Sequence, residues 1–144
     1  MSAPAGYSGT PLPRKLGIAA GDAVLLSGAP AGFDLGPLPN AVTVHRRRSR
    51  PRYDVVLAFC PDRAALQAGF GPWKALLGPA GALWVAWPKR ASGVVTDLSD
   101  NAVREHGLAG GLVDVKVCAV DEVWSAIKLV YRLSDRSKVS STQA

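Results

Sequence analysis

The sequence is poor in the residues that build metal and disulfide sites. It has two cysteines and two histidines among its 144 residues. Cys60 and Cys118 each stand alone in an apolar segment, without a C-x-x-C pattern or a neighbouring histidine. This spacing does not match zinc or paired-thiol motifs and favours two reduced, buried thiols. We therefore expect neither a metal site nor a disulfide.

Long apolar runs and targeting signals are also missing. No apolar stretch approaches the roughly 20 residues of a membrane-spanning helix. The opening MSAPAGYSG has neither the basic start nor the apolar centre of a secretory signal. These absences favour a cytoplasmic protein that does not enter a membrane. With 48% hydrophobic and 19% charged residues, the composition is that of a globular chain.

Positive charge is in excess and is concentrated in two places. The net charge is +6 at pH 7, and the segment HRRRSRPR at residues 45–52 holds five of the 17 lysines and arginines. A second basic segment spans residues 132–138. Such charge is compatible with an anionic small molecule or with a protein partner, including a second copy of the chain. No aromatic residues interleave with the arginines to stack on bases, so the segment is not typical of a nucleic-acid-binding surface.

Apolar segments separated by turn residues predict an α/β fold. Strands are expected at residues 23–27, 42–45, 53–60, 83–87, 112–120 and 125–133. Only a short turn separates the last two, which favours an antiparallel pair. Because the strands at 53–60 and 83–87 are continuously apolar, they suit a sheet buried on both faces. We predict a three-layer, Rossmann-like α/β fold with a mostly parallel sheet and a C-terminal antiparallel strand pair.

Glycine, proline and capping residues set the expected helices and turns. A short helix is expected at residues 13–16, and residues 78–81 are expected to form a turn. A longer helical segment at 62–77 should be bent or broken, because it contains Gly69, Gly71 and Pro72. A third helix should begin at Thr96 or Ser99 and end at Gly107.

The length and these signals predict one domain between less regular ends. Residues 1–19 are expected to form an N-terminal arm with the short helix, and residues 20–133 the single Rossmann-like domain. The polar residues 134–144 are expected to be a disordered tail.

A ligand site is predicted after the apolar strand that ends at Pro88. In open α/β sheets, ligands bind outside the carboxyl ends of the strands. A cation there, beside a flexible loop and a helix N-terminus, suits an anion. The predicted ligand-binding residues are Lys89, Arg90, Ser92 and Gly93, with Gly28 after the first strand and Asp121 and Trp124 at the last turn.

Each of these residues also has an ordinary structural interpretation. Lys89 is equally compatible with a solvated loop, Asp121 with a turn, and Trp124 with core packing. No set of residues has the spacing of a known catalytic site, and no cofactor is specified by the sequence.

The order of the segments resembles the second half of the class I methyltransferase plan. The resemblance is carried by YDVVLAF at 53–59, a helix, LLGPAGALWVAWP at 76–88 and the closing antiparallel pair. It implies a Rossmann-like fold and, as an activity, methyl transfer from S-adenosylmethionine. Two departures stand out. The family places an acidic residue at the end of the second strand to hold the ribose of the cofactor, whereas this chain has His45, and the loop from Gly28 to Gly32 lacks the family's GxGxG spacing.

A second resemblance covers nearly the whole chain. AGYSGTPLPRKLGI at 5–18, WPKRASGVVTDL at 87–98 and GLVDVKVCAVDEVWSAIKLV at 111–130 are similar to a family of small bacterial proteins, domain of unknown function 3052 (DUF3052). That resemblance implies no activity.

Three functions are therefore compatible with the sequence. The first is a module that binds an anionic small molecule or nucleotide without catalysis. The second is a protein-protein interaction domain that uses the basic segment or a sheet edge. The third is a divergent S-adenosylmethionine-dependent methyltransferase.

Overall fold

A six-stranded β-sheet organises the computed structural model, which describes residues 10–141. The strands are β1 Ala23–Ser27, β2 Thr43–His45, β3 Tyr53–Phe59, β4 Leu77–Pro88, β5 Leu112–Ala119 and β6 Trp124–Tyr131. Their order in the sheet is β2-β1-β3-β4-β6-β5. Strand β6 runs antiparallel to β4 and β5, whereas β1, β2, β3 and β4 pair in parallel. The predicted mostly parallel sheet with a C-terminal antiparallel pair is confirmed.

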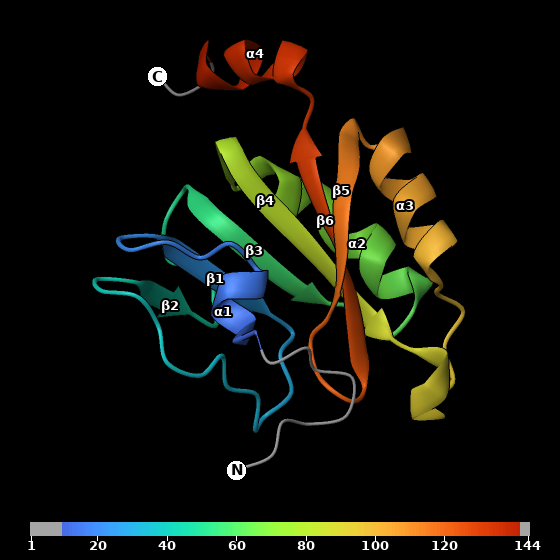
Figure 1. The fold of residues 1–144 in the computed structure, drawn as a ribbon. Coiled ribbons are helices and arrows are strands. Elements are labelled where there is room, and N and C mark those ends of the chain that lie inside the picture. Colours follow the sequence, from blue (N-terminus) through green and yellow to red (C-terminus); the bar gives the residue numbers. More distant parts are fainter. Residues whose placement is uncertain (1–9, 142–144) are drawn as a thin grey trace.

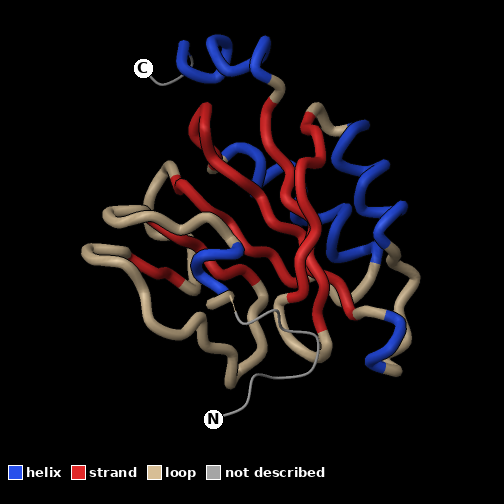
Figure 2. The backbone as a smooth tube through the Cα atoms, viewed as in Figure 1, coloured by secondary structure: helices blue, strands red, loops and turns tan. Residues whose placement is uncertain are grey.

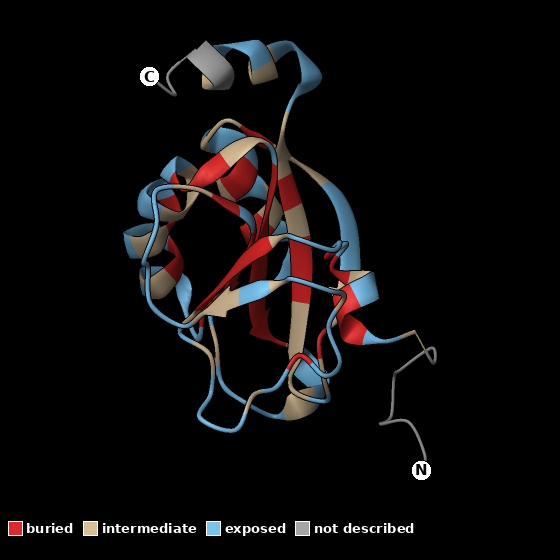
Figure 3. Ribbon diagram, turned by 90° about the vertical axis from the view of Figure 1, so that its left-hand side faces the viewer, coloured by how far each residue is buried: buried red, intermediate tan, exposed pale blue. Residues whose placement is uncertain are grey.

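Helices cover both faces of this sheet. They are α1 Leu12–Lys15, α2 Arg63–Ala75, α3 Asp100–Ala109 and α4 Arg136–Ser141, with two 3-10 turns, η1 Arg90–Ser92 and η2 Leu133–Asp135. Helices α2 and α3 lie on one face of the sheet, and α1 lies on the other with the loop that follows β1 (Figures 1 and 3). The core is therefore divided by the sheet into two clusters.

Strands β3 and β4 are buried on both faces because their side chains alternate between the two clusters. Val56 and Val85 face the side of α2 and α3, while Leu57 and Trp84 face the side of α1. These four residues have no exposed side-chain surface. The continuous apolar sequence follows from this double burial, which Figure 3 shows as the band of buried strand residues between the helices.

Helix α2 runs without a break from Arg63 to Ala75, so the predicted division into two short helices is wrong. Asp62 is its N-cap, and the Asp62 side chain accepts a hydrogen bond of 2.9 Å from the amide of Ala65. Pro72 lies near the carboxyl end of α2, so only a few helical residues follow it. Gly69 provides space rather than a bend, because a Cβ atom there would overlap the ring of Trp73.

Helix α3 ends at Ala109, with Gly110 as its C-cap, and the predicted stop at Gly107 is wrong. The Ser99 hydroxyl accepts a hydrogen bond of 3.2 Å from the amide of Ala102, which confirms one of the two expected caps. Gly107 lies inside the helix at its approach to the sheet, where a Cβ atom would be 2.7 Å from Cδ2 of Leu129. A glycine is needed there for packing and not for a turn.

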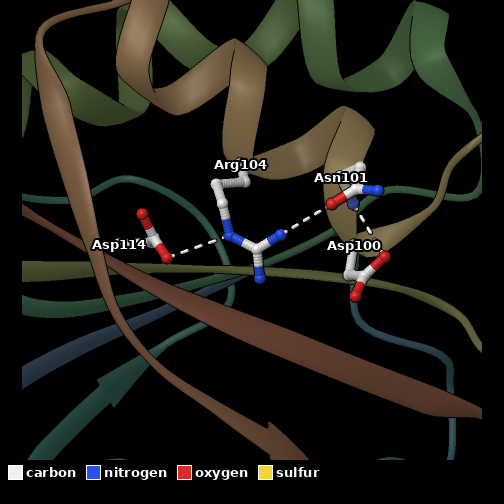
Figure 4. Close-up of polar contacts among 4 residues, drawn as sticks. All are labelled: Asp100, Asn101, Arg104 and Asp114. Carbon is white, nitrogen blue, oxygen red and sulfur yellow. Dashed lines mark hydrogen bonds and ion pairs between the residues drawn. The ribbon is translucent and has the colours of Figure 1, made fainter.

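An ion pair on the surface ties α3 to the edge strand β5. Arg104 Nε lies 3.0 Å from Asp114 Oδ2, and Arg104 also donates to the side chain of Asn101 (Figure 4). The side chains of Arg104 and Asp114 are about one-third exposed, at 30% and 31%. The pair helps to fix the orientation of α3 relative to β5.

The expected turn at residues 78–81 is instead the first part of β4, and that prediction is wrong. The register between β3 and β4 shifts between Tyr53 and Val55. Gly81 lies at this irregularity, where a Cβ atom would be 3.1 Å from the amide nitrogen of Gly78 and 3.2 Å from the carbonyl oxygen of Tyr53. The glycines and the proline therefore shape a bulged strand and do not interrupt it.

At the ends of the chain, the structure describes part of what the sequence predicts. Residues 1–9 of the expected N-terminal arm lie outside the described residues, and α1 follows them. Residues 134–141, in the segment expected to be a disordered tail, belong to η2 and α4. Figures 1 and 2 show this helix beyond the end of β6, apart from the other helices. Within residues 10–141, no helix has the length and apolar character needed to cross a bilayer.

Candidate functional site

A cavity of about 620 Å³ opens at the carboxyl end of β4, on the face that carries α2 and α3. Its floor includes Trp87 from β4 and Ser125 from β6, and Val117 from β5 closes one side. The loop between β4 and α3 and the start of α3 supply the other lining residues, which are Pro88, Lys89, Arg90, Gly93, Val94, Val95, Thr96, Leu98, Ser99 and Asp100. This volume lies in the range of small-molecule sites.

Hydrogen bonds to the beginning of α2 hold the loop between β4 and α3. The Thr96 hydroxyl donates to the carbonyl oxygen of Pro61 at 2.7 Å, and the Asp97 carboxylate accepts from the amide of Arg63 at 2.7 Å. At the other end of the loop, the amide of Lys89 donates to the carbonyl oxygen of Val123 at 2.8 Å. The loop is thus anchored on both sides of the cavity mouth.

Three of the sequence-predicted ligand residues, Lys89, Arg90 and Gly93, line the cavity. Gly93 has a φ of +78°, a conformation that favours glycine, and it ends the 3-10 turn η1. Ser92 supports the loop from within, because its hydroxyl donates to the carbonyl oxygen of Lys89 at 2.7 Å and accepts from the amide of Val94 at 3.2 Å.

The other predicted ligand residues have different surroundings. Asp121 Oδ1 accepts hydrogen bonds of 2.9 Å from the amides of Val123 and Trp124, so its side chain forms the turn between β5 and β6. Trp124 packs edge to face against Phe59 with ring centres 5.1 Å apart, in the core cluster on the side of α1. Neither side chain lines the cavity at Lys89.

Gly28 lies at the end of β1 in a left-handed conformation, with a φ of +70°. A Cβ atom there would be 3.1 Å from the carbonyl oxygen of Phe59, so the turn after β1 presses closely against the end of β3. Gly28 is therefore required by this close approach, at a position separate from the cavity at Lys89.

Several lining residues were not predicted as ligand contacts. Val94, Val95 and Val117 are about half exposed or more, at 48%, 94% and 51%. All three border the cavity. For Val94 and Val95, the sequence signal is a pair of valines inside an otherwise polar loop. Val117 belongs to a distant strand, and only the fold brings it to the cavity.

The ionisable groups that line the cavity are Lys89, Arg90 and Asp100, which together carry one net positive charge. Asp100 accepts a hydrogen bond of 2.8 Å from the amide of Asn101, in the first turn of α3 (Figure 4). The N-terminus of α3 adds a partial positive charge on the same side. The cavity mouth is therefore weakly positive.

Cys60 follows β3 and is fully buried. Burial, and secondarily the carboxylate of Asp62, raise the pKa of its thiol from 9.0 to about 12. Cys118 is only partly buried, so the expectation of a second buried thiol is wrong; the burial that it has raises its pKa, although Lys15 and Lys116 oppose this. A protonated, buried thiol is a poor nucleophile. Within the described residues, no group of three or more histidine, cysteine or acidic side chains could hold a metal ion.

A second cavity, of about 460 Å³, lies between β1, β2 and the loop after β1. At the end of β2, Nδ1 of His45 is 2.7 Å from the hydroxyl of Tyr53. The next residue, Arg46, lines this cavity and donates a hydrogen bond to the carbonyl oxygen of Phe33. Both side chains are thus engaged within the protein. Residues 28–42 contain no helix, so the loop offers no helix N-terminus to an anion.

The basic segment divides into arginines that stabilise the fold and arginines that face solvent. Arg52 donates hydrogen bonds to the carbonyl oxygens of Ala75 and Leu77 at 3.0 and 2.9 Å, at the end of α2. Arg47, Arg48 and Arg50 are exposed. The exposed arginines leave the predicted protein-interaction surface available.

Comparison with solved structures gives the class of fold. The structure of a complex of DhpI with SAH matches with a TM-score of 0.60 at 13% identity, covering 85% of this chain and 83% of that one. TrmN from Thermus thermophilus matches with a TM-score of 0.48 at 15% identity. The match covers 84% of this chain and 47% of TrmN. A putative methyltransferase from Thermoplasma acidophilum matches at 0.48 and 11% identity, covering 80% and 70% of the two chains. The first of these likenesses shows that the chain has a methyltransferase-like Rossmann fold.

The comparisons with protein families and with curated proteins give no match. The resemblance to the bacterial family DUF3052 is therefore not supported by them.

Proposed function

We propose that the chain is a small-molecule-binding domain on a methyltransferase-like fold, and that it holds an anion in the cavity at the carboxyl end of β4. The observation that carries this proposal is the meeting of Lys89, Arg90 and the N-terminus of α3 around one cavity of about 620 Å³. Anions are stabilised both by cationic side chains and by helix N-termini. In sheets of this type the carboxyl edge is also the usual place for ligands.

Thermal unfolding in the presence of small anions tests the proposal. The panel is acetate, benzoate, inorganic phosphate and adenosine monophosphate, each at millimolar concentration. A ligand that binds only the native state raises the Tm by mass action. We expect at least one anion to raise the Tm of the wild type, and the effect to disappear in the Lys89→Ala and Arg90→Ala variants.

Lys116→Ala is the matched control, because Lys116 lines a different basic cavity with Arg14 and Lys15. This variant should keep the full response to the anion. If the response is lost in Lys116→Ala and kept in Lys89→Ala, the anion binds at the other cavity and the proposal is wrong. Absence of a response to every anion also overturns it.

Methyl transfer from S-adenosylmethionine is a second candidate function. The observation that favours it is the likeness to the DhpI structure, which is a complex with SAH. At 13% identity this likeness concerns the fold and gives no information about the residues of a site. The residues at the ends of β1 and β2 do not fit the cofactor as the family holds it, because His45 replaces the acidic residue and is bonded to Tyr53.

Calorimetric titration with S-adenosylhomocysteine tests this second candidate directly. Micromolar binding that is weakened by substituting Gly28 or residues of the cavity at Phe33 would support a methyltransferase. If S-adenosylhomocysteine does not bind at millimolar concentration while an anion binds at Lys89, the methyltransferase candidate is wrong and the anion-binding proposal stands.

A further inference from the structure

The cavity at Lys89 has two chemically different halves. One half is formed by Lys89 and Arg90 at the carboxyl end of β4. The other half consists of the apolar lining residues, among them Trp87, which is buried, and Val94, Val95 and Val117, which are about half exposed or more; Thr96, Ser99 and Ser125 also line the cavity. An inorganic anion would contact the cationic half and leave the apolar half in water.

The exposure of these valines is the feature that a purely polar ligand does not explain. Single exposed apolar residues are common on protein surfaces, but apolar side chains gathered on one rim indicate a binding surface. Val95 is 94% exposed, and Val94 and Val117 are 48% and 51% exposed. Val117 comes from β5, so the rim is assembled from two parts of the chain that only the sheet brings together.

The loop that presents Val94 and Val95 is held in place by hydrogen bonds on both sides. The amide of Val94 donates to the hydroxyl of Ser92 at 3.2 Å, and the hydroxyl of Thr96 donates to the carbonyl oxygen of Pro61 at 2.7 Å. The valines are therefore kept at the cavity mouth without packing into the core. A ligand that covers them gains apolar contact without ordering the loop first.

Charge complementarity limits the ligand further. Lys89, Arg90 and Asp100 are the ionisable residues that line the cavity, and together they leave one net positive charge. A monoanion matches this balance, whereas a dianion would face Asp100 with an unmatched second charge.

We infer that the ligand of this cavity is an amphipathic monoanion, with a carboxylate at Lys89 and Arg90 and an alkyl or aryl body over Trp87 and the valine rim. This inference rests on the proposed function and specifies the ligand class for the same cavity. Its chemical signature is an affinity that increases with the length of the apolar body.

The test is a calorimetric titration of the intact chain with acetate, butanoate, hexanoate and octanoate. Each methylene that becomes fully buried should increase the affinity about fourfold, and partial burial in an open cavity gives a smaller factor. We expect the affinity to rise at least twofold per methylene up to hexanoate. Hexyl phosphate, which is largely a dianion at neutral pH, should bind no more tightly than hexanoate.

Variants separate the two halves of the cavity. Val95→Ser should reduce the gain per methylene, so that octanoate loses more affinity than acetate does, and its exposed position makes it compatible with the fold. Val115→Ser is the matched control, because Val115 is also an exposed valine, at 56%, but does not line this cavity. Lys89→Ala should weaken all four carboxylates by a similar factor.

The failures of the two proposals are distinguishable. If carboxylates bind with an affinity independent of chain length, or if Val95→Ser and Val115→Ser behave alike, the amphipathic ligand class is wrong while anion binding stands. If no carboxylate binds and Lys89→Ala has no effect on any anion, the proposed function itself is wrong.

Discussion

The indole nitrogen of Trp84 donates a hydrogen bond of 3.1 Å to the carbonyl oxygen of Leu16, across 68 residues of sequence. Trp84 lies in the centre of β4 and Leu16 caps the short helix α1, and both are buried. This bond fastens α1 to the middle of the sheet. It also satisfies a polar atom of each partner in an otherwise apolar environment.

The Trp84→Phe variant should therefore lose stability. It leaves the Leu16 carbonyl without this donor and removes part of a buried ring, so we expect a loss of about 2–4 kcal/mol in the free energy of unfolding, measured with urea. Trp73→Phe is the comparison, because Trp73 donates to the side-chain hydroxyl of Ser27, which can turn to another partner. Equal losses in the two variants would argue against the role given to the Trp84 bond.

Two glycine-to-alanine substitutions in helices should differ in their effect on stability. Alanine at Gly107 places a Cβ atom 2.7 Å from the buried side chain of Leu129, so we expect a loss of about 1–3 kcal/mol despite the better helix propensity of alanine. A Cβ atom at Gly71 in α2 meets no other part of the chain within 4 Å, but Gly71 precedes Pro72, whose ring disfavours a helical residue with a Cβ atom, so alanine there should change stability by less than about 1 kcal/mol. Thermal unfolding measures both, and stabilisation by Gly107→Ala would contradict the close packing of α3 on β6.

The thiol of Cys60 should make stability fall at alkaline pH. Its pKa is raised by burial from 9.0 to about 12. Below pH 9 the thiol is protonated in both the folded and the unfolded chain and has no effect on the pH dependence. Between pH 9 and about 12 it ionises only in the unfolded chain, so the free energy of unfolding falls by up to about 1.4 kcal/mol per pH unit.

Urea unfolding of the wild type and of Cys60→Ala from pH 7 to 10.5 measures this contribution. Above pH 9 the free energy of unfolding should decline less steeply in the variant than in the wild type, because the two proteins share all other titrating groups. Parallel curves would contradict the raised pKa. The same burial predicts that alkylating reagents modify Cys60 only after unfolding.

The ion pair between Arg104 and Asp114 should contribute little to stability. Because both side chains are about one-third exposed, a double-mutant cycle with Arg104→Ala and Asp114→Ala should give a coupling energy below about 1 kcal/mol. In 1 M salt the coupling should fall, because the screening length drops to about 3 Å. A coupling that is large and independent of salt would indicate a more buried pair.

The exposed arginines test whether the chain associates with itself. If the basic segment forms a homo-oligomer, reversing Arg47, Arg48 and Arg50 to Glu should convert a larger species to a monomer in light scattering after size exclusion. Lys138→Glu is the control, because its side chain is 80% exposed on α4, outside that segment. A wild type that is monomeric at high micromolar concentration would contradict the oligomer prediction.

Local sequence signals predicted the elements well where one short pattern was enough. Strands β3 and β4 are apolar on both faces, and Asp62 and Ser99 cap α2 and α3 through their own side chains. The signals failed where a glycine or proline served packing between elements. Gly107 leaves space for the side chain of Leu129, and Gly81 leaves space for the backbone at the bulge beside Tyr53. Neither reason can be recognised from the neighbouring residues in the sequence.

The sequence by itself determined the α/β class, the strands and the position of Lys89 and Arg90 after a buried strand, since each depends on neighbours along the chain. Tertiary structure decided which predicted site residues meet. Alternation along β4 and β6 directs Trp87 and Trp124 to opposite faces, so Trp124 joins the core with Phe59 while Trp87 forms the cavity floor. Strand pairing then brings Val117 and Ser125 to the same cavity. Contacts of this kind depend on the order and register of strands, which local sequence patterns do not encode.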